Sequence, residues 1–275
     1  MPTFSIPGGP TISYRDSGGE GVPIIFSHGL FMSKDMFAPQ FAEFTKDHRC
    51  IVWDERGHGE TVWDGGDFTY WDSADDLLAL ADHLGIDRFI HFGFSQGGLL
   101  ALRAAIKSPD RFIGLIQCST QARGLAGDGA DAFRAYIQEW IDGGPTEDKI
   151  EFLINLILGP QLKPEDEAFW VEYWKTLTPQ QLTDALSALY SSEDIEDQLH
   201  AITAPVVVIH GLKDVSTPLE LALNVPKLVP DHRGTLLVEE GPHALNLTHA
   251  EQANEFTRAF VDEVTSEFEK TAAGV

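Results

Sequence analysis

The chain has 275 residues, of which 43% are hydrophobic and 10% aromatic, so it can build a large core and is not a mostly disordered protein. Its 43 Asp and Glu residues outnumber its 19 Lys and Arg residues, which gives a formal net charge of −24 at pH 7. Such a surface repels nucleic-acid phosphates and anionic lipid headgroups, so neither nucleic acid nor membrane is an expected partner.

Short apolar segments alternate with longer helical patterns through the first 120 residues. An amphipathic helix is expected over residues 73–84 and an Ala/Leu-rich helix over residues 97–106. Strands that are apolar on both faces and are separated by helices predict a parallel sheet covered on both sides. Four segments have this strand pattern: residues 22–26, 50–54, 89–93 and 112–118.

A different pattern begins after about residue 123. Residues 130–198 contain no strand-like segment, and we expect several amphipathic helices there, rich in aromatic residues and separated by Gly and Pro. The alternation of strands and helices returns with strands expected at residues 204–211 and 234–238 and a last helix at 250–268.

This order of elements predicts one α/β domain with a mostly parallel, doubly wound sheet and a helical insertion. It explains the pattern better than two successive domains do, because the same strand pattern occurs before and after the insertion. The predicted units are the first part of the core, the insertion and the second part of the core: residues 1–122, 123–200 and 201–275.

Residues 93–97 have the sequence Gly-Phe-Ser-Gln-Gly, which matches G-x-S-x-G. Glycine is needed at both ends because the serine of this pattern occupies a strained turn, where a flanking side chain would meet the neighbouring backbone. The segment directly follows an expected strand and begins an expected helix. We therefore predict Ser95 as a nucleophile raised above the sheet.

A serine hydroxyl is a weak nucleophile unless a base accepts its proton, so a histidine and an orienting carboxylate are expected further along the chain. Asp214 comes just after the strand expected at 204–211, and His243 comes after the strand expected at 234–238. Both follow the carboxyl ends of parallel strands, where open α/β sheets place their sites. We predict Ser95, Asp214 and His243 as the catalytic residues.

The tetrahedral intermediate of acyl transfer carries an oxyanion, which requires two hydrogen-bond donors. In this topology the donors come from the residue after the serine and from the loop after an early strand. We therefore predict an oxyanion hole formed by the backbone N–H groups of Gln96 and Leu30. His28 is expected to hold the Leu30 loop rather than to take part in the chemistry.

The motifs of this chain resemble those of the α/β-hydrolase-fold serine hydrolases, and the likeness covers nearly all of its length. Their spacing resembles a subgroup of small carboxylesterases, enol-lactonases and cofactor-free haloperoxidases and perhydrolases. The resemblance implies that the insertion forms a helical cap over the active site, and that Ser95, Asp214 and His243 act as nucleophile, orienting carboxylate and base. The matching motifs are residues 27–30, 54–59, 93–98, 210–214 and 241–243.

Comparison with the family pattern also excludes some relatives. Epoxide hydrolases and haloalkane dehalogenases use an Asp nucleophile, whereas this chain has Ser95 at that position. Gln96 stands where many relatives have Met, and Leu30 where perhydrolases often have a bulkier aromatic residue. These two departures leave the particular substrate open.

Apolar residues beside the predicted catalytic positions and on the insertion are candidates for a substrate pocket. An apolar pocket under helices favours a small, uncharged or amphipathic ester or lactone, and the negative charge of the chain disfavours a highly anionic substrate. Aromatic residues at helical spacing more often belong to a core than to a pocket. The predicted pocket residues are Phe31, Met32, Phe94, Trp140, Trp170 and Leu245.

The predicted function is therefore the hydrolysis of a carboxylic ester or lactone through an acyl-enzyme. Three alternatives stay open, which are perhydrolase or haloperoxidase-type acyl transfer to peroxide, hydrolysis of a C–C bond, and ligand sensing by a protein of the same fold. We expect no cofactor, and no metal because no His or Cys group has ligand spacing.

The sequence predicts a cytoplasmic protein. Its start has no basic segment followed by an apolar one, and no stretch of about 18 apolar residues occurs. Cys50 and Cys118 lie in apolar segments and are expected as small buried side chains. The expected partner is the small substrate, and the choice between a monomer and a homo-oligomer stays open.

Overall fold

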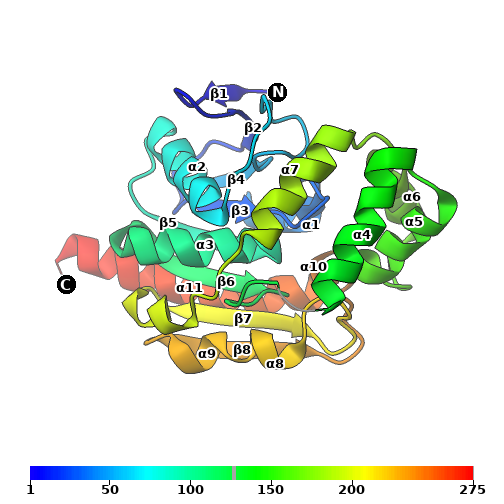
Figure 1. Cartoon of the computed structure of the whole chain (residues 1–275). Coiled ribbons are helices and arrows are strands. Elements are labelled where there is room, and N and C mark those ends of the chain that lie inside the picture. Colours follow the sequence, from blue (N-terminus) through cyan, green and yellow to red (C-terminus); the bar gives the residue numbers. More distant parts are fainter. Residues whose placement is uncertain (126–127, 275) are drawn as a thin grey trace.

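The computed structural model describes residues 1–125 and 128–274 and contains an eight-stranded sheet (Figure 1). The β1–β2 and β2–β4 pairs are antiparallel, and the other neighbouring pairs are parallel, which confirms the prediction of a mostly parallel sheet. In spatial order the strands are β1 (Thr3–Ser5), β2 (Thr11–Asp16), β4 (Cys50–Trp53), β3 (Ile24–Ser27), β5 (Phe89–Phe94), β6 (Phe112–Cys118), β7 (Val206–Gly211) and β8 (His232–Val238).

Helices cover both faces of the sheet, as its doubly apolar strands predict. Ile24 and Phe26 of β3 belong to one core cluster, and Ile25 between them belongs to another, because successive side chains of a strand point to opposite faces. The first cluster contains residues of α1 (Ala38–Phe44) and α11 (Ala250–Ala273). The second contains residues of α2 (Tyr70–His83) and α3 (Gln96–Lys107).

Four α-helices are found in the described residues between β6 and β7: α4 (Asp128–Gly143), α5 (Glu147–Leu153), α6 (Pro164–Lys175) and α7 (Pro179–Tyr190). Figure 1 shows α4, α5 and α6 grouped beyond the end towards which β7 points. Trp140, Trp170 and Trp174 are buried in the first core cluster, together with Ile24 and Phe26 of β3, so α4 and α6 share a continuous apolar core with the sheet. The division at residues 123 and 200 stays a prediction.

Cys50 and Cys118 are buried, which confirms the prediction, and neither forms a disulfide. Along residues 1–125 and 128–274, no helix combines the length and the apolar character needed to cross a bilayer.

Shorter helices complete the connections between these elements. They are η1 (Lys34–Phe37), η2 (Pro109–Arg111), the π-helix η3 (Ile154–Leu158), η4 (Glu196–Ala201), α8 (Leu219–Ala222), α9 (Val225–Leu228) and α10 (Leu245–Thr248).

Candidate active site

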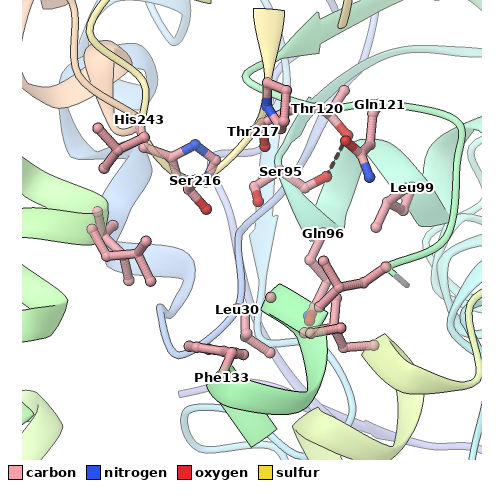
Figure 2. Close-up of a pocket in the computed structure, with 18 of the residues that line it drawn as sticks. Leu30, Ser95, Gln96, Leu99, Thr120, Gln121, Phe133, Ser216, Thr217 and His243 are labelled. Carbon is pink, nitrogen blue, oxygen red and sulfur yellow. Dashed lines mark hydrogen bonds between the residues drawn. The ribbon is translucent and has the colours of Figure 1, made fainter. Parts of the chain in front are cut away.

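Ser95 occupies a tight turn between β5 and α3. Its φ is 51°, a left-handed conformation that is strained for a residue with a side chain. Two hydrogen bonds hold this turn in place. The Ser95 N–H donates to the Cys118 carbonyl over 2.9 Å, and the Thr120 hydroxyl donates to the Ser95 carbonyl over 2.6 Å (Figure 2).

Gly93 and Gly97 flank this turn where the backbone comes too close for a side chain. A Cβ atom on Gly93 would lie 2.6 Å from the Gly97 carbonyl oxygen. A Cβ atom on Gly97 would lie 2.0 Å from the carbonyl oxygen of Ser27 on β3. Both distances are far below a van der Waals contact, so the close packing of strand and helix explains the glycines of the G-x-S-x-G pattern.

A cavity of about 680 Å³ borders the turn. Ser95, Gln96, Leu30 and His243 all line it, and Figure 2 shows the imidazole of His243 on the same side of the cavity as Ser95. Within the described residues no hydrogen bond joins the Ser95 hydroxyl to His243. The Nδ1 atom of His243 binds Asp214, which leaves the Nε2 atom of the ring free. Hydrogen bonds between catalytic groups often tighten only when substrate binds.

Asp214 orients the ring of His243. His243 Nδ1 lies 2.8 Å from Asp214 Oδ2, and Asp214 Oδ1 accepts the backbone N–H groups of Ser216 (2.8 Å) and Thr217 (2.9 Å). Burial by itself would raise the pKa of Asp214, but His243 and the Thr217 N–H hold this pKa below its ordinary value. Asp214 is therefore a carboxylate, which binds the Nδ1–H of the ring and leaves His243 Nε2 as a proton acceptor.

Two residues that the sequence did not predict position the backbone around His243. Ser119 directly follows β6, has a φ of 49°, and donates its hydroxyl to the His243 carbonyl over 2.7 Å. The Ser119 carbonyl in turn accepts the hydroxyl of Thr217 over 3.2 Å. The only sign of this role in the sequence is the position of Ser119 at the carboxyl end of an expected strand.

The backbone N–H groups of Leu30 and Gln96 have no acceptor within the described part of the chain. Gln96 is the first residue of α3, and the first N–H groups of a helix have no partner inside it. The Gly29 carbonyl accepts hydrogen bonds from the Met32 N–H (3.0 Å) and from His28 Nδ1 (2.9 Å). The Gly29 carbonyl and the Leu30 N–H belong to the same peptide group, and in a trans peptide the C=O and the N–H point in opposite directions. The bonds to the carbonyl therefore also fix the direction of the Leu30 N–H. The two free donors suit an oxyanion hole, a role that stays a prediction.

Two aromatic residues of α6 hold the loop that carries Leu30. Trp174 Nε1 donates to the Phe31 carbonyl over 2.9 Å, and the Tyr173 hydroxyl donates to the Met32 carbonyl over 3.1 Å. Phe31 has a φ of 59°, so these bonds help to support a strained turn. The sequence pattern predicts aromatic residues on the helices of the insertion, but it does not predict the contact of Trp174 with Phe31, 143 residues away in the chain.

The pocket prediction requires correction for four of its six residues. Phe31 and Phe94 line the cavity, and the remaining four do not. All six side chains are at most 2% exposed and belong to one core cluster, so burial alone does not distinguish a wall residue from a core residue. Proximity in sequence to a predicted site residue placed Phe31 and Phe94 in the cavity wall but not Met32 and Leu245. The two large aromatic rings predicted from the helices of the insertion were buried in the core. The four residues that do not line the cavity are Met32, Trp140, Trp170 and Leu245.

Other apolar side chains from the insertion line the cavity instead. One Lys or Arg is found among the described residues that line the cavity, Arg123, and it lies 2.9 Å from Glu196 and 3.5 Å from Asp194. These carboxylates compensate its charge. The larger apolar side chains that line it from α4, α5 and η3 are Phe133, Tyr136, Phe152, Leu156 and Ile157, and its polar groups include Thr120, Gln121, Ser216 and Thr217.

A buried carboxyl group lies behind Gln96. Gln96 Nε2 donates to Glu55 Oε2 over 2.7 Å, and the Tyr70 hydroxyl donates to Gln96 Oε1 over 3.2 Å. Burial raises the pKa of Glu55 well above its ordinary value, although the hydrogen bond from Gln96 opposes this rise. Burial therefore favours the uncharged acid form of Glu55 in the folded chain.

This raised pKa predicts a stability that depends on pH. The unfolded chain releases the Glu55 proton near pH 4.5, while the folded chain keeps it to a higher pH, so the free energy of unfolding falls as pH rises above 4.5. The Glu55 contribution is a loss of about 1.4 kcal/mol per pH unit, up to the raised pKa of the folded state. Glu55→Gln removes it, so urea unfolding at pH 5, 6 and 7 should give a stability difference that grows with pH in favour of the variant. A difference independent of pH would contradict an uncharged Glu55.

Comparisons with known proteins agree with the fold. A family model described as "alpha/beta hydrolase fold" matches residues 22–250. The chain is 27% identical to a bifunctional esterase/perhydrolase of Acinetobacter calcoaceticus, over 92% of this chain and 96% of that protein. It is 28% identical to 3-oxoadipate enol-lactonase 2 of Acinetobacter baylyi, over 90% of this chain and 92% of that protein. A thermophilic esterase from Thermogutta terrifontis superposes with a TM-score of 0.84 at 26% identity, covering 96% of this chain and 97% of that one.

Proposed function

Since this chain belongs to the α/β hydrolase fold family, we propose that it is a serine hydrolase that cleaves a neutral carboxylic ester or lactone without a cofactor. The observation that carries the proposal is the hydrogen bond between His243 and Asp214 at the wall of the cavity that Ser95 also lines. Relatives named as an esterase/perhydrolase and as an enol-lactonase support chemistry at an ester bond.

In the proposed mechanism, Ser95 Oγ attacks the substrate carbonyl while His243 Nε2 takes its proton. Asp214 keeps the ring in the required tautomer and stabilises the imidazolium. The N–H groups of Leu30 and Gln96 donate to the oxyanion, and its collapse expels the alcohol, which receives the proton from His243. Water, deprotonated by the same imidazole, then attacks the acyl-enzyme and releases the acid.

The cavity supports a neutral substrate. Its wall is mainly aromatic and aliphatic, and Arg123 already lies within salt-bridge distance of two carboxylates. A substrate carboxylate would lose its hydration without gaining an uncompensated cation. The net charge of −24 adds a repulsion that acts on any anionic substrate as it approaches.

We therefore expect kcat/KM for p-nitrophenyl hexanoate to be at least about 10-fold higher than kcat/KM for the p-nitrophenyl monoester of adipic acid. A factor of ten corresponds to a difference of about 1.4 kcal/mol in the free energy of the transition state. The two esters share the leaving group and the length of the acyl chain and differ in one terminal carboxylate. Release of p-nitrophenol, corrected for the uncatalysed rate, measures both. Equal values would contradict the neutral substrate, and the absence of turnover across a panel of neutral esters and lactones would contradict the proposed function itself.

Acyl transfer to peroxide is the second candidate, because one relative is named as a bifunctional esterase/perhydrolase. Peroxide would replace water as the nucleophile that attacks the acyl-enzyme, with the same triad and oxyanion hole. The amounts of peracid and of acid, measured in one sample that contains the enzyme, p-nitrophenyl acetate and hydrogen peroxide, distinguish the two reactions. A peracid yield no higher than the uncatalysed yield excludes this candidate.

A further inference from the structure

Glu55 lies in the loop directly after β4, and none of its surface is exposed. It makes hydrogen bonds to two residues that belong to opposite halves of the site, His28 through its backbone and Gln96 through its side chain. Building on the proposed function, we propose that Glu55 is a positioning residue that fixes the two backbone donors of the oxyanion hole relative to one another.

The first connection runs through His28 to Leu30. The Glu55 N–H donates to His28 Nε2 over 2.9 Å, so this nitrogen is the acceptor of the ring and the proton lies on Nδ1. Burial, and to a smaller extent the neighbouring His58, lowers the pKa of His28 well below its ordinary value, so the ring is neutral. Its Nδ1–H donates to the Gly29 carbonyl over 2.9 Å, in the same peptide group as the Leu30 N–H. The Glu55 backbone therefore fixes the direction of the Leu30 donor.

The second connection runs through the side chain of Gln96. Glu55 Oε2 accepts from Gln96 Nε2 over 2.7 Å, and the Tyr70 hydroxyl binds the other end of the same amide over 3.2 Å. Gln96 is 3% exposed and begins α3, so a side chain held at both ends restricts the backbone of the first helical turn. The Gln96 N–H is the second proposed donor of the oxyanion hole.

The chemistry of Glu55 suits this place. A carboxylate so close to the oxyanion would oppose the charge that develops there, whereas an uncharged carboxyl group accepts the Gln96 bond without that repulsion. Glu55 Oε1 has no hydrogen-bond partner among the described residues. Replacement of this oxygen by the NH₂ of glutamine therefore breaks no hydrogen bond that the structure contains.

The test measures kcat, KM and the affinity for a trifluoromethyl ketone, whose adduct with serine carries an oxyanion. We expect Glu55→Ala to lower kcat about 10-fold and to leave KM within about twofold of the value for the unmodified chain. This decrease in kcat is smaller than the decrease of about 10²–10³-fold that follows removal of a whole oxyanion-hole donor. The affinity for the ketone should fall by the same factor. Glu55→Gln should stay within about threefold of the unmodified chain in all three quantities.

Combined variants distinguish positioning from a general loss of structure. Glu55→Ala and Gln96→Leu act through one side-chain bond, so together they should lower kcat no further than the stronger of the two. Glu55→Ala and His28→Leu disturb different donors, so their effects on kcat should multiply. Leu77→Ala on α2 is the control, because it removes a buried core side chain that forms no part of either hydrogen-bonded connection. It should destabilise the fold and leave kcat per folded molecule within about twofold.

Unchanged kcat and ketone affinity in Glu55→Ala would overturn this inference, as would a Glu55→Gln loss equal to that of Glu55→Ala. If Glu55→Ala does not fold, Gln96→Leu provides the same test, because it keeps the backbone N–H and removes the same side-chain bond. Failure of the proposed function is a separate result, in which the unmodified chain turns over no ester or Ser95→Ala retains full activity.

Discussion

Under the proposed mechanism, replacement of Ser95 by alanine is expected to lower kcat for ester hydrolysis by at least about 10³-fold, as removal of a triad member does in serine hydrolases. The effect should appear in kcat rather than in KM, because the cavity wall keeps its shape when a single hydroxyl is lost. Water could still attack a substrate that is held by the Leu30 and Gln96 donors, so a small residual rate should persist. Initial rates with p-nitrophenyl hexanoate at saturating substrate measure the loss.

Ser216→Ala is a matched control for this variant. Ser216 lines the same cavity, but its backbone N–H, not its hydroxyl, binds Asp214, so the substitution should leave kcat within about twofold. A fluorophosphonate probe, which reacts with an activated serine, should label the unmodified chain and Ser216→Ala but not Ser95→Ala. Near-normal activity or labelling in Ser95→Ala would remove Ser95 from the mechanism.

The central strands of the fold were predictable because they are buried on both faces. Every residue of β5, β6 and β7 is buried, and a strand of this kind is visible in the sequence as a continuous apolar segment. β1 and β2 were missed because they lack such a segment. Both outer residues of β1 are exposed, and β2 ends with the half-buried Arg15 and Asp16 at the antiparallel side of the sheet. Their pairing depends on partners that a local pattern does not contain.

The proposed reacting residues could be predicted more easily than the walls around them. Ser95, Asp214 and His243 each follow a strand, and the order of parallel strands brings such positions to one edge. The cavity wall depends instead on which face of each helix of the insertion turns towards the site. Phe133 and Trp170 both lie on helices of the insertion, yet Phe133 lines the cavity and Trp170 is buried in the core.

Replacement of Asp214 by asparagine is expected to lower kcat by about 10⁴-fold while the fold is kept, because the variant stabilises the wrong tautomer of His243. Two backbone N–H groups donate to Asp214 Oδ1, so the carbonyl oxygen of asparagine should occupy that position. Its NH₂ group would then face His243 Nδ1, which must accept a hydrogen bond instead of donating one. The ring proton moves to Nε2, where it prevents the imidazole from taking the proton of Ser95.

This explanation can be separated from a loss of charge or of stability. Asp197→Asn makes the same chemical change at an exposed aspartate in the same half of the chain and should leave kcat within about twofold. Labelling by the fluorophosphonate probe, which also requires deprotonation of Ser95, should slow in parallel with kcat in Asp214→Asn. Nitrogen NMR of the His243 ring should place the proton on Nδ1 in the unmodified chain and on Nε2 in the variant. A large loss of kcat with the proton still on Nδ1 would mean that Asp214 acts mainly by stabilising the imidazolium, because the tautomer would then be correct and only the charge missing.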